Sequence, residues 1–177
     1  MRNDETLVSS RHNPETQERD FSDALGDSPE SLARTEFEIR SLAATDLGPI
    51  CRIDKRLTGL DRSGYLAQKI DEVINQSGIR VSLIAVRDGL VAGFIMARLD
   101  YGEYGHTASV AIIDTIGIDP GQSGAGSALL NQLFDNLGSL RLDGVRTIVK
   151  WDDTAMNYFL SKAGFEPGPR LALRCVL

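Results

Sequence analysis

Apolar and polar residues follow two different spacings along the chain from about residue 36 onward. Alternation predicts strands over 36–42, 107–118, 145–151 and 170–177, and two more within 79–99 that are joined at Asp88 and Gly89. An Asp-Gly pair between apolar runs is a strong signal for a β-hairpin. Apolar residues three and four positions apart predict helices over 44–57, 65–78 and 154–164, and one more that carries Leu129, Leu133 and Leu137.

The order of these elements predicts an α/β fold of α+β character. The sheet is expected to be mixed and mostly antiparallel, with about six strands flanked by about four helices, because hairpins come first and strand-helix crossovers come late. Residues 1–34 are polar and lack a sustained period, which is typical of a segment that buries too little to become ordered. We therefore expect a mobile acidic tail over 1–34 and one domain over 35–177.

Charge and composition exclude several classes of protein. The net charge is -6, and residues 1–34 contain eight carboxylates and four arginines, so no Lys/Arg stripe favours nucleic acid or anionic lipid. The longest uncharged apolar run is far too short to span a bilayer, and charges occupy the place of a signal-peptide core. The two cysteines, Cys51 and Cys175, have no metal-binding spacing and are expected to pack. A cytoplasmic protein without a metal is the expectation.

A glycine-rich turn lies between a predicted strand and the leucine-rich helix, and three interpretations of it compete. Gly121 and Gly126 have the spacing of a P-loop, but no lysine follows Gly126. Gly124 and Gly126 match the first two glycines of a dinucleotide fingerprint, but Leu129 stands at the third position and antiparallel strands precede the turn. The remaining alternative is a glycine-rich connection that binds no ligand.

The turn also resembles the pyrophosphate-binding loop of the GNAT superfamily of N-acetyltransferases, in Pro120, Gln122, Gly124 and Gly126. The resemblance covers about residues 36–177, and the loop is one residue shorter on each side of Gln122 than the family pattern. Small residues at a helix start leave backbone N–H groups free for an anion. The resemblance implies cofactor contacts from Gln122, Ser123, Gly124, Ala125, Gly126 and Ser127.

The segment from Asp153 to Phe165 is similar to a second motif of this superfamily. Asp153 takes the place of the family's Asn and Phe159 matches its Phe, so the resemblance implies that both contact the cofactor, although Phe159 can equally be a packing residue. Leu160 takes the place of the Tyr that often protonates the departing thiolate. Tyr158 lies about 200° away around the helix, so it is only a weak candidate for the acid.

Asp114 is the candidate general base, because an amine with a pKa of about 10.4 must lose a proton before it attacks. Strand alternation predicts that it shares one face with Val110, Ile112, Ile116 and Ile118, where desolvation would raise its pKa. It also aligns with a glutamate that often serves as base in the family. A polar residue at a sheet edge, or one bound to a backbone N–H, is an equally good interpretation.

Gly117 interrupts the same strand, which indicates either a bulge or a close approach of a ligand to the backbone. The resemblance implies that the strand splays here, that the backbone from Ile116 to Ile118, including Gly117, pairs with the pantetheine arm, and that an N–H polarises the thioester carbonyl.

Further polar residues are weaker candidates. His106 is a loop residue that could line the acceptor pocket, and Trp151 is expected to pack. The charged segment between the first two helices is either a solvated connection or the acceptor-side wall of the family's site. Its charged residues are Arg52, Asp54, Arg56, Asp61 and Arg62.

Together these features predict an acetyl-CoA-dependent N-acetyltransferase that acts on a primary amine by direct attack in a ternary complex. The alternative is a catalytically weak or inactive acyl-CoA-binding module that serves as a sensor or partner subunit. The expected partners are acetyl-CoA and an amine acceptor, with no nucleic acid and no membrane, and a homodimer is possible. The sequence leaves the acceptor open.

Overall fold

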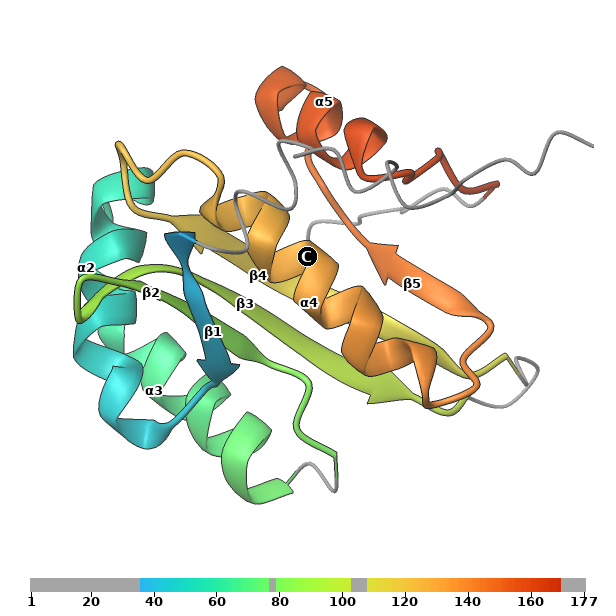
Figure 1. The fold of residues 1–177 in the computed structure, drawn as a ribbon, viewed down its shortest axis with the longest axis horizontal. Coiled ribbons are helices and arrows are strands. Elements are labelled where there is room, and N and C mark those ends of the chain that lie inside the picture. The colour runs from blue at the N-terminus through green and yellow to red at the C-terminus, as the bar shows by residue number, and fades with distance from the viewer. Residues whose placement is uncertain (1–35, 77–78, 103–107, 170–177) are drawn as a thin grey trace, which may run out of the picture.

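The computed structural model describes residues 36–76, 79–102 and 108–169 (Figure 1). The predicted tail over 1–34, the strand over 170–177 with Cys175, and His106 lie outside the described residues. The division into tail and domain therefore stays a prediction.

Five strands form a single sheet in the order β1-β2-β3-β4-β5 within the described part of the chain. Neighbours from β1 to β4 pair antiparallel, and β4 and β5 pair parallel. The mixed, mostly antiparallel sheet is confirmed, with five strands where the sequence predicts about six. The strands are β1 (Glu38–Ser41), β2 (Leu83–Arg87), β3 (Leu90–Asp100), β4 (Val110–Ile118) and β5 (Gly144–Thr147).

In the residues that the structure describes, four α-helices accompany this sheet, as the apolar spacing predicts. They are α2 (Leu47–Thr58), α3 (Ser63–Asp71), α4 (Ala125–Gly138) and α5 (Thr154–Lys162). A short 3-10 turn, η2 (Ala44–Asp46), leads into α2, and a π-helical turn, η3 (Glu72–Gln76), continues α3. The second predicted helix, over 65–78, therefore starts two residues earlier and is not α-helical in its last part.

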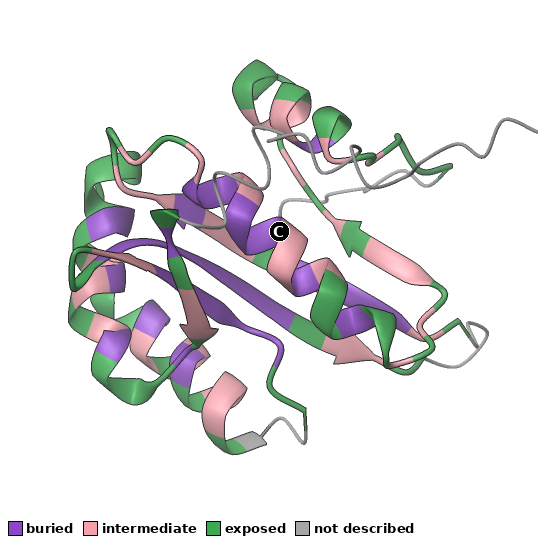
Figure 2. Ribbon diagram, in the orientation of Figure 1, coloured by how far each residue is buried: buried purple, intermediate pink, exposed green. Residues whose placement is uncertain are grey.

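The helices cover both faces of the sheet, so each face has its own core (Figures 1 and 2). α4 packs on one face, where Leu129 and Leu133 join the strand residues Ile95 and Ile113 in a buried cluster. α2 and α3 pack on the opposite face, where Ile50, Ile53, Leu66 and Ile70 surround Ile84, Phe94 and Met96. β3 lies between the two cores, which is why it is a nearly continuous apolar run without alternation.

The β2–β3 hairpin forms where the Asp-Gly pair predicts it. Asp88 and Gly89 have φ angles of 51° and 75°, the positive values that a two-residue type I′ turn needs at both central positions. Two other sequence expectations are wrong. Trp151 is 93% exposed and does not pack. Asp54 lies on α2 and is only 4% exposed, because it faces inward and forms an ion pair with Arg62, so a solvated connection is the wrong interpretation for this residue, and the alternative, an acceptor-side wall, stays a prediction.

Candidate functional site

β4 leaves its parallel partner halfway along its length. Pairs with β5 run from Val110↔Gly144 to Ile113↔Thr147 and then stop, whereas pairing with β3 continues to Ile118. Within the described residues, the backbone of 114–118 therefore has no strand partner on its β5 side. Free N–H and C=O groups along such an edge can bind an extended ligand as an added strand.

A β-bulge lies in β4 at Asp114. Thr115 pairs with Met96 and Ile113 pairs with Ala97, so Asp114 is the extra residue of β4. Side chains after the bulge shift by one position, and Ile116 and Ile118 therefore pack in the same cluster as Ile113, under α4. The predicted shared face of Asp114 with Ile116 and Ile118 is wrong, because alternation assumed a regular strand.

Asp114 lies in a polar and charged setting instead of an apolar one. Its side chain is 37% exposed and forms an ion pair with Arg98, whose Nε lies 3.3 Å from a carboxylate oxygen. The hydrogen bond to Glu72 is the main reason that the pKa of the Lys69 ammonium on α3 is raised, and the charge of Asp114 adds a smaller contribution. The prediction that apolar neighbours desolvate Asp114 is therefore wrong, while its role as base stays a prediction.

The glycine-rich loop makes a compact turn between β4 and α4. The N–H of Asp119 donates to Ala92 O (2.8 Å), and that of Gln122 donates to Asp119 O (3.0 Å). Gly121 and Gly124 both have φ of 88°, a left-handed conformation that favours glycine. Gly124 is the N-cap of α4, and no side chain caps the helix. The first-turn N–H groups of Gly126 and Ser127 therefore point out of the helix start without a side-chain acceptor.

Gln122 carries an unsatisfied polar atom in this loop. Among the described residues, its Oε1 is a buried side-chain oxygen without a hydrogen-bond partner. A buried oxygen of this kind normally finds a donor, and a ligand amide N–H would supply one. Because the two ends of an amide are assigned from their contacts, a rotated Gln122 would offer its NH₂ to a phosphate oxygen instead.

α5 reaches the start of α4 through Phe159. A Cβ on Gly126 would lie 3.1 Å and 3.2 Å from two carbons of the Phe159 ring, so this glycine makes room for that ring. Leu160 is buried in the core, whereas Tyr158 is 67% exposed and lies beside Lys162, so the two occupy opposite sides of α5 as the helical angle predicts.

Asp153 and Gly117, for which the sequence predicts cofactor contacts, both have contacts within the chain. Asp153 is the N-cap of α5, and its Oδ1 accepts a hydrogen bond from the Met156 N–H at 3.0 Å. A Cβ on Gly117 would lie 2.5 Å from Phe94 Cε1, so the close approach at this glycine is that of an aromatic ring from β3. The bulge itself lies at Asp114 and not at Gly117.

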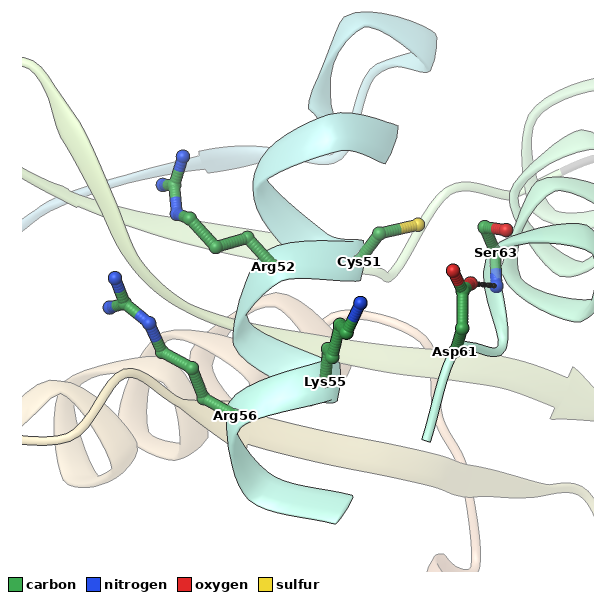
Figure 3. A pocket seen from close by; sticks show the side chains of 6 residues that line it. All are labelled: Cys51, Arg52, Lys55, Arg56, Asp61 and Ser63. Atoms are coloured by element: carbon green, nitrogen blue, oxygen red, sulfur yellow. Dashed lines mark hydrogen bonds between the residues drawn. The ribbon is translucent and has the colours of Figure 1, made fainter. Parts of the chain in front are cut away.

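A pocket of about 520 Å³ lies against α2, and it is lined by Cys51, Arg52, Lys55, Arg56, Asp61 and Ser63 (Figure 3). Arg56 connects this helix to the glycine-rich loop, because its Nη1 donates to both carboxylate oxygens of Asp119 at 2.7 and 2.9 Å. Cys51 is partly buried, and burial first, then the charges of Asp61 and Asp54, raises the pKa of its thiol.

Sequence reasoning missed Arg98, Lys69 and Asp119 as parts of this region. Strand register brings Arg98 to Asp114, and helix packing places Lys69 within electrostatic range of it, and local patterns contain neither relation. Asp119 had a weak signal, as a carboxylate directly between the strand and Pro120. In the part of the chain that the structure describes, no group of three His, Cys, Asp or Glu side chains could hold a metal, and no helix has the length and apolarity to cross a membrane.

Among the comparisons with known proteins, only the one with solved structures finds similar chains. No protein-family model matches the sequence, and no curated protein matches it. Aminoglycoside N-acetyltransferase AAC(6')-Iy in complex with CoA is similar with a TM-score of 0.66 and 19% identity, over 79% of this chain and 94% of that one. The aminoglycoside 6'-N-acetyltransferase AAC(6')-Ih from Acinetobacter baumannii is similar with a TM-score of 0.66 and 16% identity, over 80% of this chain and 98% of that one.

The similarity extends beyond proteins described as acetyltransferases. A transcriptional regulator from Bacillus halodurans C-125 is similar with a TM-score of 0.65 and 13% identity, over 80% of this chain and 99% of that one. The chain therefore has the fold of the GNAT N-acetyltransferases. At these identities the likeness establishes the fold, and the activity must be argued from the site.

Proposed function

We propose that the protein transfers the acetyl group of acetyl-CoA to a primary amine in a ternary complex. The observation that carries this proposal is that two features meet. Within the described residues, the β4 edge over 114–118 has no strand partner on its β5 side, and the adjoining glycine-rich loop leads into the start of α4, whose first-turn N–H groups have no side-chain cap. The first suits an extended arm with amide groups and the second suits a pyrophosphate. Neighbours of the same fold include an acetyltransferase that binds CoA.

The residues of the loop fit this ligand. The N–H groups of Gly126 and Ser127 would bind the pyrophosphate, supported by the positive end of the α4 dipole. Gln122, whose buried Oε1 has no hydrogen-bond partner among the described residues, would use its side-chain amide on the arm or on a phosphate oxygen. The β4 backbone from Ile116 to Ile118 would pair with the arm. Ser123, Gly124 and Ala125 complete the turn, with Gly124 setting its left-handed step.

The chemistry is a direct acyl transfer. The amine nitrogen forms a bond to the thioester carbon, the carbon–sulfur bond breaks, and CoA leaves as a thiolate that takes up a proton. Asp114, directly or through water, would accept the proton that the amine loses. A β4 N–H at the free edge would stabilise the charge on the carbonyl oxygen. Leu160 is buried where the family has its acid, so the thiolate would be protonated by water or another group.

One specific observation favours the alternative, an acyl-CoA-binding module without turnover. Tyr158 is exposed beside Lys162 on the side of α5 opposite to Leu160, and no tyrosine replaces the family's acid there. A module of this kind would bind CoA tightly and release no thiol from acetyl-CoA with any amine. A thiol-release assay over a panel of amines separates the two functions.

The loop assignment is tested by calorimetric titration of CoA into Gly124→Val. We expect a large loss of affinity, because valine cannot adopt the left-handed conformation of Gly124 without strain. The matched control is Gly89→Val, which places the same strain in the β2–β3 turn and should bind CoA normally. Relative to CoA, dephospho-CoA should bind the parent protein only slightly more weakly, whereas pantetheine, which lacks the pyrophosphate, should bind much more weakly. Normal CoA binding by Gly124→Val would overturn the assignment.

A further inference from the structure

The pocket on α2 is predominantly cationic. Three of its six lining residues, Arg52, Lys55 and Arg56, carry positive charges, and Asp61 is the single carboxylate. Figure 3 shows Arg52 and Arg56 on one side of α2, and Cys51 and Lys55 directed toward Asp61 and Ser63. A concave surface with this balance attracts anions.

Two of these cations are not used by the fold. Arg56 is bound to Asp119, and Asp61 accepts a hydrogen bond from the Ser63 N–H at 3.1 Å. Arg52 and Lys55 are exposed, and within the described residues neither side chain has a hydrogen bond or an ion-pair partner within 4.0 Å, although the charge of Lys55 acts on Asp61. Both charged groups are therefore accessible to a ligand.

The pocket lies next to the proposed reaction site. Arg56 contacts Asp119, which directly follows Ile118, the last residue of the β4 edge that would pair with the pantetheine arm. Arg52 lies one helical turn from Arg56, about 6 Å along the α2 axis. At the bulge, Asp114 forms an ion pair with the cation Arg98.

We propose that the amine acceptor carries an anionic group, a carboxylate or a phosphate, which Arg52 and Lys55 bind while the amine faces the β4 edge. This rests on the proposed acetyltransferase function and specifies its substrate class. Figure 3 shows the two side chains directed to different sides of α2, so both would turn toward the bound group, which residues three positions apart on a helix can do. A guanidinium matches the two oxygens of a carboxylate or phosphate, and hydrogen bonds between ionised groups are the stronger kind. A polyamine would instead place like charges together. Aminoglycosides, the acceptors named for two of the fold neighbours, are polyamines and should be poor substrates.

The test uses the full chain and amines that share one alkyl chain. Pentylamine has no second functional group, whereas aminovalerate has a carboxylate, aminopentyl phosphate has a phosphate and cadaverine has a second amine. An aminoglycoside is the fifth acceptor. CoA thiol release is measured for each. We expect kcat/KM to be at least about tenfold higher for one of the two anionic amines than for pentylamine, and lowest for the polyamines. The stronger anionic arm identifies carboxylate or phosphate.

Two variants locate the effect. Arg52→Gln and Lys55→Gln should each lower kcat/KM for the preferred anionic amine by about tenfold, mainly through KM, and leave pentylamine unchanged. The matched control is Arg80→Gln, in the α3–β2 connection at the opposite end of the sheet from the glycine-rich loop (Figure 1). This variant removes the same charge as Arg52→Gln and should leave kcat/KM unchanged for both the anionic amine and pentylamine.

Three results would overturn the inference, and each has its own signature. Equal or better turnover of cadaverine or the aminoglycoside would show an acceptor of the opposite charge. A rise in KM for acetyl-CoA but not for the amine in Arg52→Gln would assign the pocket to the phosphates of CoA. No thiol release from any amine, with CoA bound normally, would overturn the proposed function itself, and the acceptor class with it.

Discussion

Replacing Gly117 by alanine should destabilise the protein without any ligand present. A Cβ at this position would lie 2.5 Å and 2.7 Å from two carbons of the Phe94 ring, closer than real contacts allow. Phe94 is 1% exposed and packs under α2 and α3, so its ring has little room to retreat. Overpacking of this kind costs about 1–3 kcal/mol, which for a domain of this size lowers Tm by roughly 3–10 °C.

Chemical and thermal unfolding of the ligand-free protein measure this cost, and two further variants locate its cause. Gly144→Ala makes the same substitution in β5, where a Cβ would have nothing within 4 Å, and should be close to neutral. Phe94→Leu removes the obstructing ring, so adding it to Gly117→Ala should recover part of the loss, with a coupling energy of about 0.5–3 kcal/mol.

The outcome also decides between two explanations of this glycine. If Gly117 is needed only for a ligand to approach the backbone, Gly117→Ala should unfold like the parent protein and lose CoA affinity alone. That result, or an equal cost of Gly117→Ala with and without Phe94, would refute the packing argument.

Three more predictions follow from the site and its support. Asp114→Asn should keep CoA affinity while kcat/KM falls by about 10² to 10⁴, the usual worth of a positioned base, and near-parent rates at every pH would make it structural. Arg40 holds the pKa of the buried Asp46 below its usual range. Asp46→Asn should therefore cost about 1–3 kcal/mol in urea unfolding at pH 7, and this difference should shrink as pH falls below about 4, because the parent loses the ion pair as Asp46 is protonated. Gly126→Ala gains the helix propensity of alanine but places a Cβ 3.1 Å from the Phe159 ring, so it should stabilise the Phe159→Leu variant more than the parent protein; an equal effect in both would contradict this.

Much of the architecture could be predicted because it depends on local spacing. The leucines of α4 recur on one face, the Asp-Gly pair supplies both positive φ angles of the hairpin turn, and Gly124 supplies the left-handed step before α4. Each of these features is set by residues a few positions apart, so periodicity and turn chemistry contain the information. The helices themselves, and the place of the glycine-rich loop at the start of α4, follow from them.

The sequence did not contain the details that depend on register and on contacts between distant segments. The bulge at Asp114 arises from how β4 pairs with β3, and it moved this carboxylate from an expected apolar face to the side of Arg98. The need for glycine at position 117 comes from the Phe94 ring, and the partner of Asp119 is Arg56, which is 63 residues away in the chain.

Thus the sequence by itself determined most of the elements, their order and the glycine-rich turn before α4, because hydrophobic period and glycine conformation act locally. The tertiary structure alone decided which charges meet at the site. Side chains distant in sequence become neighbours only when strand register and helix packing are fixed, and a single extra residue in β4 redirects every side chain after it.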